Sequence, residues 1–197
     1  MTSSTSLFSL TNKQQWLVGG ILLFIMIVTR SHIWLSHIQD ASWAVFFLLG
    51  FYVRSVLGFP VFWLVAFAVD LLVIESKGGE SFCFTASYPF LIPAYASLWF
   101  AGRWFAGHYS ESLRGLAYFV VAAVVGTFAC DVISSGGFYW FSGRFADVNM
   151  TEFAGRLARY MPMFMQTTMI YLAIAALIHF AVGRLGKYAS HGQHIAG

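Results

Sequence analysis

Long apolar runs with almost no charge are the feature that most limits what this chain can fold into. The longest covers residues 41–74, where Arg54 and Asp70 are the only charged side chains. A single helix of that length would be about 50 Å long, but the hydrocarbon core of a bilayer is about 30 Å thick. Over the whole chain 59% of residues are apolar and 10% are charged, against about 25% charged in soluble domains. Because a soluble fold of 197 residues cannot hide so many apolar side chains, the sequence predicts an integral membrane protein.

The remaining composition excludes several other classes of protein. The formal net charge is +3 and is spread over the loops without a basic block, so no nucleic-acid partner is indicated. Two cysteines are too few for a disulfide framework. Lys13 precedes an apolar run at residues 16–28 without a small-x-small cleavage site after it. That run is interpreted as a retained first helix and not as a signal peptide.

A single all-α membrane domain over residues 1–197 with six transmembrane helices is expected. The break at Gly58-Phe59-Pro60 divides the longest run in two, because proline lacks an N–H donor and disfavours helix at the residue before it. The polar stretch 75–87 and the link 134–159, rich in glycine and aromatic residues, are expected as loops, with no room for an ATPase domain. The predicted helices cover residues 14–34, 41–54, 57–74, 88–106, 113–133 and 160–185.

An even number of spans puts both termini on one side of the membrane. Slightly more Lys and Arg residues fall on that side than on the other, so the N and C termini are predicted to be cytoplasmic. Most ionisable or reactive residues then gather at the outer ends of the helices, where ionisable groups are usually functional. We expect an outward-facing pocket there, covered by residues 75–87 and 134–159. The residues that gather at this end are Arg30, His32, Asp70, Cys83, Tyr88, Cys130, Asp131, Arg156 and Arg159.

Most of these residues also have a purely structural interpretation. Asp70 and Asp131 either end their helices in the headgroup region or pair with Arg156 or Arg159. Arg30 is interpreted as an interfacial anchor. These structural roles and a ligand-binding role are both open at this stage.

Cys83 carries the sharper chemical indication, because it lies in a polar, Gly-rich loop between two phenylalanines. Three interpretations compete: a disulfide with Cys130, an inert loop residue, and a soft thiolate ligand or nucleophile. No CxxC or HExxH motif accompanies it. A single sulfur holds a free metal ion weakly, but it is sufficient as one axial ligand to a metal already caged in a macrocycle.

The segment from Asp70 through Gly78-Gly-Glu-Ser-Phe-Cys83-Phe-Thr-Ala-Ser-Tyr88-Pro-Phe, with Arg156 further on, resembles the BtuM family. This is a small family of bacterial cobalamin transporters related to the substrate-binding S-components of energy-coupling factor (ECF) transporters. The resemblance implies a six-helix S-component fold whose outer loops close over cobalamin. It also implies that Cys83 is an axial ligand of the corrin cobalt and displaces cyanide. Asp70, Tyr88 and Arg156 would be neighbouring pocket residues, with His32 a looser candidate.

The function implied by this resemblance is the uptake of cobalamin across the bacterial inner membrane. In this function cobalamin is the substrate, and decyanation is a side activity of cobalt ligation. An ECF module of coupling subunit and ATPases is the expected energy source. ECF S-components often carry an Ala-x-x-x-Ala motif in their first helix, where this chain has Gly19-Gly20. Two alternatives stay open: a membrane thiol oxidoreductase using Cys83 and Cys130, and a structural membrane subunit without a ligand.

Overall fold

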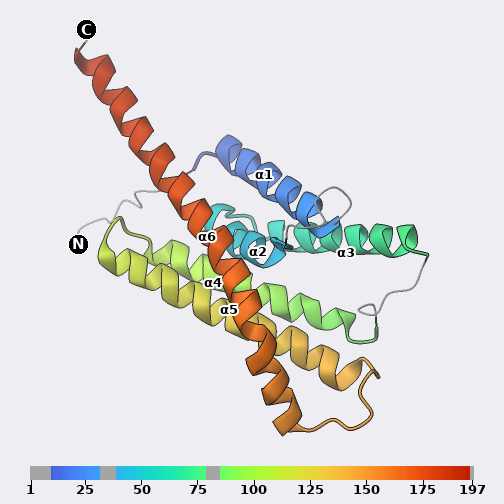
Figure 1. Cartoon of the computed structure of the whole chain (residues 1–197). Helices are drawn as coiled ribbons and strands as arrows, with labels where there is room; N and C mark the ends of the chain where they lie inside the picture. Colours follow the sequence, from blue (N-terminus) through green and yellow to red (C-terminus); the bar gives the residue numbers. More distant parts are fainter. Residues whose placement is uncertain (1–9, 32–38, 79–84, 196–197) are drawn as a thin grey trace.

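The structure is a computed structural model that describes residues 10–31, 39–78 and 85–195, with side chains in the last helix described as far as residue 184. This part of the chain is helical and contains no strand, which confirms the predicted all-α class. Its elements, shown in Figure 1, are α1 (Asn12–Ser31), α2 (Ser42–Tyr52), α3 (Gly58–Ser76), the 3-10 turn η1 (Tyr88–Phe90), α4 (Leu91–His108), α5 (Leu113–Phe141) and α6 (Met150–Ile195).

Four of the described helices are long and apolar enough to cross a membrane: α1, α3, α5 and the part of α6 over Met150–Arg184. Their outer faces carry large apolar side chains, such as Trp16 at 82% exposure and Leu72 at 69%. Such extensive exposed apolar surface is typical of contact with lipid. These helices are compatible with a multi-pass membrane protein. The shorter α2, at about 16 Å, falls well below the thickness of a bilayer core.

The core of the molecule forms around α2, which contacts α1, α3, α4 and α6 (Figure 1). An unusually large share of its 11 residues is buried, and it has no polar face. A helix that is apolar all round belongs in the interior of a bundle. The buried residues of α2 are Ser42, Ala44, Val45, Phe46, Phe47, Leu49 and Gly50.

Glycines let α4 approach its neighbours at backbone distance. A Cβ atom on Gly102 would collide with the carbonyl oxygen of Phe47 on α2, and one on Gly50 would collide with that of Trp99 on α4. On the other side of α4, a Cβ on Gly126 of α5 would lie 2.8 Å from the Cβ of Ala101. Without a strong hydrophobic force between helices in lipid, close packing of small residues is a main source of helix association.

The expected loop over residues 134–159 is wrong for most of its length, because only residues 142–149 separate α5 from α6. α5 continues through Gly136 and Gly137, although glycine is a poor helix former. Tertiary packing accounts for this: the ring of Phe90 fills the place of a Cβ on Gly137 and stacks on Phe141 at 4.9 Å between centroids. Packing against η1 therefore outweighs the local propensity.

The start of α6 lies ten residues before the predicted one, and its capping explains why. The side-chain oxygen of Asn149 accepts a hydrogen bond of 2.8 Å from the backbone N–H of Glu152, the arrangement of a helix N-cap. Asn149-Met-Thr-Glu152 fits the spacing of a capping box. Pro162 lies inside α6.

We predict that Gly102→Ala destabilises the protein by about 1–3 kcal/mol or more, because the new methyl group meets backbone that cannot move aside. Gly107→Ala in the same helix is the matched control, since nothing lies within 4 Å of its added Cβ. That control is expected to be neutral or slightly stabilising. Thermal unfolding in detergent measures both variants, and equal effects would contradict the close α2–α4 contact.

Candidate functional site

Arg30, in the last turn of α1, is the centre of a buried polar cluster at one end of the bundle. Its side chain is only 9% exposed and faces the carboxylate of Asp70 on α3. The Nε and Nη2 groups donate to Oδ1 and Oδ2 of Asp70, both at 2.6 Å. This two-point pairing is the strong geometry for arginine and a carboxylate. Arg30 is thus a buried partner of a carboxylate, and Asp70 pairs with Arg30 instead of Arg156 or Arg159.

The other edge of the Arg30 guanidinium connects α1 to α2 and α4. Its Nη1 donates to Oδ2 of Asp40, to the Ser42 hydroxyl and to the Tyr95 hydroxyl, each at 3.0 Å. The Ser42 hydroxyl in turn donates to Oδ1 of Asp40 at 2.6 Å. Every nitrogen of the guanidinium is thus used, which is what a charge so deeply buried requires.

Tyr88 joins the same cluster from η1, where its hydroxyl donates to Oδ2 of Asp70 at 2.7 Å. Burial, followed by this hydrogen bond and the negative charge of Asp70, raises the pKa of Tyr88 above its usual value. The phenol therefore stays a donor over the whole physiological pH range. We call this set the Arg30 cluster; its members are Arg30, Asp40, Ser42, Asp70, Tyr88 and Tyr95.

The Arg30 cluster brings together two of the residues expected from the sequence, Asp70 and Tyr88, which are 18 positions apart. Asp70 accepts three hydrogen bonds within the cluster, of the roughly four that a carboxylate accepts. One acceptor position of Asp70 is left for a ligand. The cluster contains two carboxylates for one guanidinium. Its excess of negative charge favours a ligand that donates hydrogen bonds.

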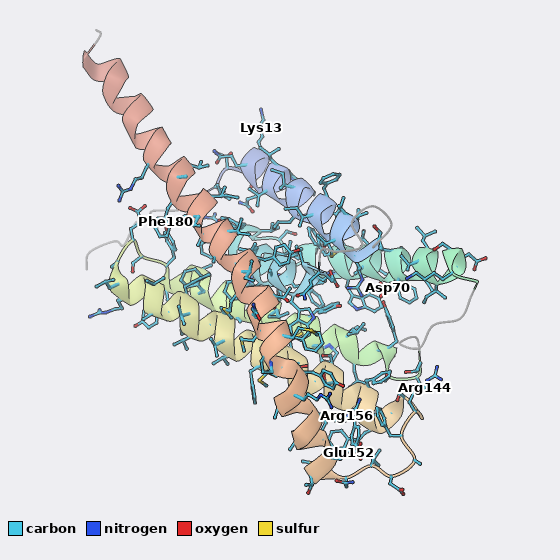
Figure 2. The ribbon with its side chains drawn as sticks, in the orientation of Figure 1. Lys13, Asp70, Arg144, Glu152, Arg156 and Phe180 are labelled. Atoms are coloured by element: carbon cyan, nitrogen blue, oxygen red, sulfur yellow. The ribbon has the colours of Figure 1, made fainter. Side chains whose placement is uncertain are left out.

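Arg156 lies elsewhere, in a groove between the end of α5 and the start of α6. In Figure 2, Asp70 and Arg156 lie toward one end of the bundle, and Lys13 and Phe180 toward the other. The guanidinium of Arg156 lies over the ring of Phe145, at 4.6 Å from its centroid. The volume of this α5–α6 groove is about 330 Å³, and it is mostly apolar. The groove is lined by Ser134, Ser135, Phe138, Tyr139, Phe145, Phe153, Arg156, Leu157, Tyr160 and Phe164.

Two residues expected at the outer end of the fifth helix are deeply buried instead. Because α5 runs on to Phe141, Asp131 lies about 15 Å before the end of the helix and does not end it. Its side chain is 1% exposed, and its Oδ1 accepts from Ser135 at 2.7 Å. The neighbouring Cys130 has a free thiol and is 0% exposed, so the structure contains no disulfide at Cys130.

Cys83 and His32 lie outside the described residues, so their proposed ligand roles rest on the sequence alone. Among the residues that are described, no group of His, Cys, Asp and Glu side chains could hold a metal ion.

His179 on α6 makes two polar contacts that were not expected from the sequence. Its Nδ1 lies 2.9 Å from the Tyr52 hydroxyl, and its Nε2 lies 2.9 Å from the Tyr109 hydroxyl. Burial, with a smaller contribution from the nearby charge of Glu111, raises the pKa of Tyr109. An ionisable residue within an apolar run was the indication available in the sequence. The contact ties α6 to α2 at the end of the bundle away from Asp70.

Comparison with known proteins adds no family to this picture. No protein-family profile matches the chain, and no curated protein matches it at a significant level.

We predict that Arg30→Met lowers the free energy of unfolding by about 2–4 kcal/mol, because it leaves two partly buried carboxylates without their cation. The matched control is Arg159→Met, since Arg159 is an exposed arginine whose loss is expected to change stability by less than about 1 kcal/mol. Unfolding in detergent measures the difference. Similar losses in the two variants would show that the Arg30 cluster contributes little to stability.

Proposed function

We propose that this chain is a membrane transport protein that binds cobalamin at the end of the bundle that carries Asp70. The observation that carries the proposal is the hydrogen bond of 2.7 Å between Tyr88 and Asp70. The resemblance to the BtuM family assigns these two residues to one ligand pocket, and they are distant in sequence but in contact in space. Membrane-compatible helices and the absence of any metal-binding group in the described residues are consistent with a cargo whose metal is already caged.

Around this pair, the chemistry of the proposed pocket suits a corrinoid. The remaining acceptor position of Asp70 is suited to the N–H groups of the amide side chains on a corrin rim. The α5–α6 groove, at the same end of the bundle, supplies aromatic walls and the cation of Arg156. Apolar and aromatic walls with a few polar groups are the usual composition of a ligand site.

In the proposal, Cys83 supplies the axial ligand to cobalt, and His32 is a looser candidate for a neighbouring pocket residue. Cys83 lies five residues before Tyr88 in the sequence. Only the deprotonated thiol ligates a metal. Its thiolate replaces the axial cyanide of cyanocobalamin, which leaves with its bonding electron pair as cyanide ion, and the cobalt stays in the +3 state. Decyanation then follows from binding and needs no further reactant.

The burial of Cys130 weighs against the alternative of a thiol oxidoreductase. Its thiol is 0% exposed and packs within the core between the helices. A redox pair with Cys83 requires both sulfurs to meet and to be reached by a partner thiol. No observation favours a purely structural subunit over a binding protein.

We predict that protein purified from cells supplied with cyanocobalamin is coloured. It should carry about one cobalt per chain, because the proposal gives each chain one cobalamin-binding site. Cys83→Ser should change the visible spectrum of the bound corrinoid, because it removes the soft axial ligand. Cys130→Ala is the matched control, since it removes the other thiol and should leave the spectrum unchanged. Absence of cobalt would contradict cobalamin binding, and identical spectra for wild type and Cys83→Ser would contradict ligation by Cys83.

The proposal also includes an orientation in the bacterial inner membrane, with six spans, an S-component fold and both termini in the cytoplasm. In this arrangement α2 lies within the bundle, and α4 crosses with the exposed side chains of Phe100 and Trp104 facing lipid. An ECF module of coupling subunit and ATPases, bound from the cytoplasmic side, is the proposed source of energy.

We predict that reporters fused to the N and C termini are both active in the cytoplasm, as the excess of Lys and Arg on that side implies. Enzymatic reporters that fold only in the cytoplasm or only in the periplasm measure this. A C terminus in the periplasm would put the Asp70 end of the bundle on the wrong side for uptake and would contradict the orientation.

A further inference from the structure

Asp131 is an ionisable residue deep inside a membrane-spanning helix that the proposed pocket does not use. Its side chain is 1% exposed. Ser135, one turn further along α5, donates to its Oδ1 at 2.7 Å, while its Oδ2 is buried and has no hydrogen-bond partner in the described residues. Ionisable groups in such positions are costly and usually have a function.

No cation compensates Asp131 within the part of the chain that the structure describes, where both salt bridges belong to Arg30. The titratable groups at this end of the bundle have other contacts. Cys130 is its neighbour on α5, Tyr95 of α4 bonds to Arg30, and Tyr88 of η1 bonds to Asp70. On α6, Arg156 and Arg159 lie against aromatic rings, Glu152 accepts from Tyr139, and Tyr160 lies beside Arg156. A carboxylate with one donor and no cation is strongly disfavoured in such surroundings.

A second orphaned atom lies one helical turn away on the same face of α5. The Oγ1 of Thr127 is buried and also has no partner in the described residues, and Thr127 precedes Asp131 by four positions, which puts both on one face. A proton on Oδ2 turns that oxygen into a donor, which the Thr127 oxygen accepts after a small rotation or through one bridging water. The Thr127 hydroxyl can also donate to a carboxylate oxygen, so this pairing is open to either protonation state. The neutral acid is favoured because Asp131 is 1% exposed and has no cation beside it in the described residues.

Ser135 connects this buried acid to the α5–α6 groove, because its side chain both contacts Asp131 and lines the groove. A serine hydroxyl has only one proton to donate. When Asp131 is charged, that proton is held by the carboxylate, and Ser135 offers the groove only acceptor lone pairs. When Asp131 is protonated on Oδ2, Oδ1 is a neutral and weaker acceptor, so the hydroxyl can leave it to donate to a ligand in the groove.

We propose that Asp131 is a proton-binding site inside the membrane, and that its proton sets the direction in which Ser135 hydrogen-bonds into the α5–α6 groove. A carbonyl oxygen of a carboxamide ligand in the groove favours the protonated state, because only then does Ser135 donate. At pH values where Asp131 is partly charged, binding of such a ligand is accompanied by proton uptake from solvent. The coupling to cobalamin rests on the proposed function, but the proton site itself does not.

Infrared spectroscopy of the ligand-free protein in detergent tests the proton site directly, since a protonated carboxyl group has a C=O stretch well separated from that of a carboxylate. We expect this band at neutral pH in the wild type and its loss in Asp131→Asn. Asp147→Asn, which changes an exposed aspartate in the α5–α6 link, is the matched control and should keep the band. Absence of the band from wild type, or its persistence in Asp131→Asn, would overturn the proposal.

Ser135→Ala provides a second test that keeps Asp131 in place and does not depend on the folding of Asp131→Asn. Loss of the Ser135 hydroxyl removes the donor to Oδ1, so the C=O band should shift in frequency. The same shift in protein labelled with ¹³C at the aspartate carboxyl groups identifies the band as that of an aspartate. An unchanged band in Ser135→Ala would mean that the protonated group is not Asp131.

The coupling is measured with cyanocobalamin as the probe, by its dissociation constant across the pH range in which the band titrates. Wild type should bind more weakly as the band disappears, by roughly fivefold or more, and Asp131→Asn should lose this dependence. Equal pH dependence in the two proteins would overturn the coupling. Failure of every variant to bind cobalamin would refute the proposed function, while the infrared result would still decide the proton site.

Discussion

The Arg30 guanidinium is the group around which the polar end of this molecule is arranged. An arginine side chain does not lose its proton in a protein, so its burial is tolerable only where carboxylates and hydroxyl groups surround it. Asp70 from α3, Asp40 and Ser42 from the start of α2, and Tyr95 from α4 meet this need. The ends of α1, α3 and α4 are consequently held together, and Tyr88 is positioned through Asp70.

Away from this cluster the bundle is held by shape and not by charge. α2 and α4 approach at backbone distance through Gly50 and Gly102, which leaves no space for lipid or water between them. α6 lies across this core and is attached at separate places along its length (Figure 1). Phe164 stacks on Trp43 at 5.2 Å, the Tyr171 hydroxyl donates to the carbonyl oxygen of Gln39, and His179 contacts α2 further on. Since residue 39 adjoins Asp40, α6 is mechanically connected to the Arg30 cluster.

The order and number of α-helices in the described residues follow from the apolar runs and the break at Pro60, because periodicity and proline act locally. The extent of α5 does not follow, because Gly136 and Gly137 locally disfavour helix and the packing of Phe90 against Gly137 is a tertiary contact. The Asn149 cap is a local pattern that could have been recognised. The partner of Asp70 could not have been, since nothing in the sequence distinguishes Arg30 from Arg156 as its cation. Cys83 and His32, the other residues expected at the pocket, lie outside the described residues.

The two buried ionisable residues, Arg30 and Asp131, differ in how they can respond to a ligand. Arg30 holds a permanent charge that two carboxylates and two hydroxyl groups already balance, so this cluster can orient a ligand but cannot change its own protonation without breaking apart. Asp131 has one donor, an orphaned oxygen and a hydrogen-bonded route to the groove through Ser135. A group in that position exchanges its proton without loss of any bond between helices. If one end of this bundle both binds a cargo and responds to it, the fixed pair positions the ligand, and the unpaired acid is the part free to respond.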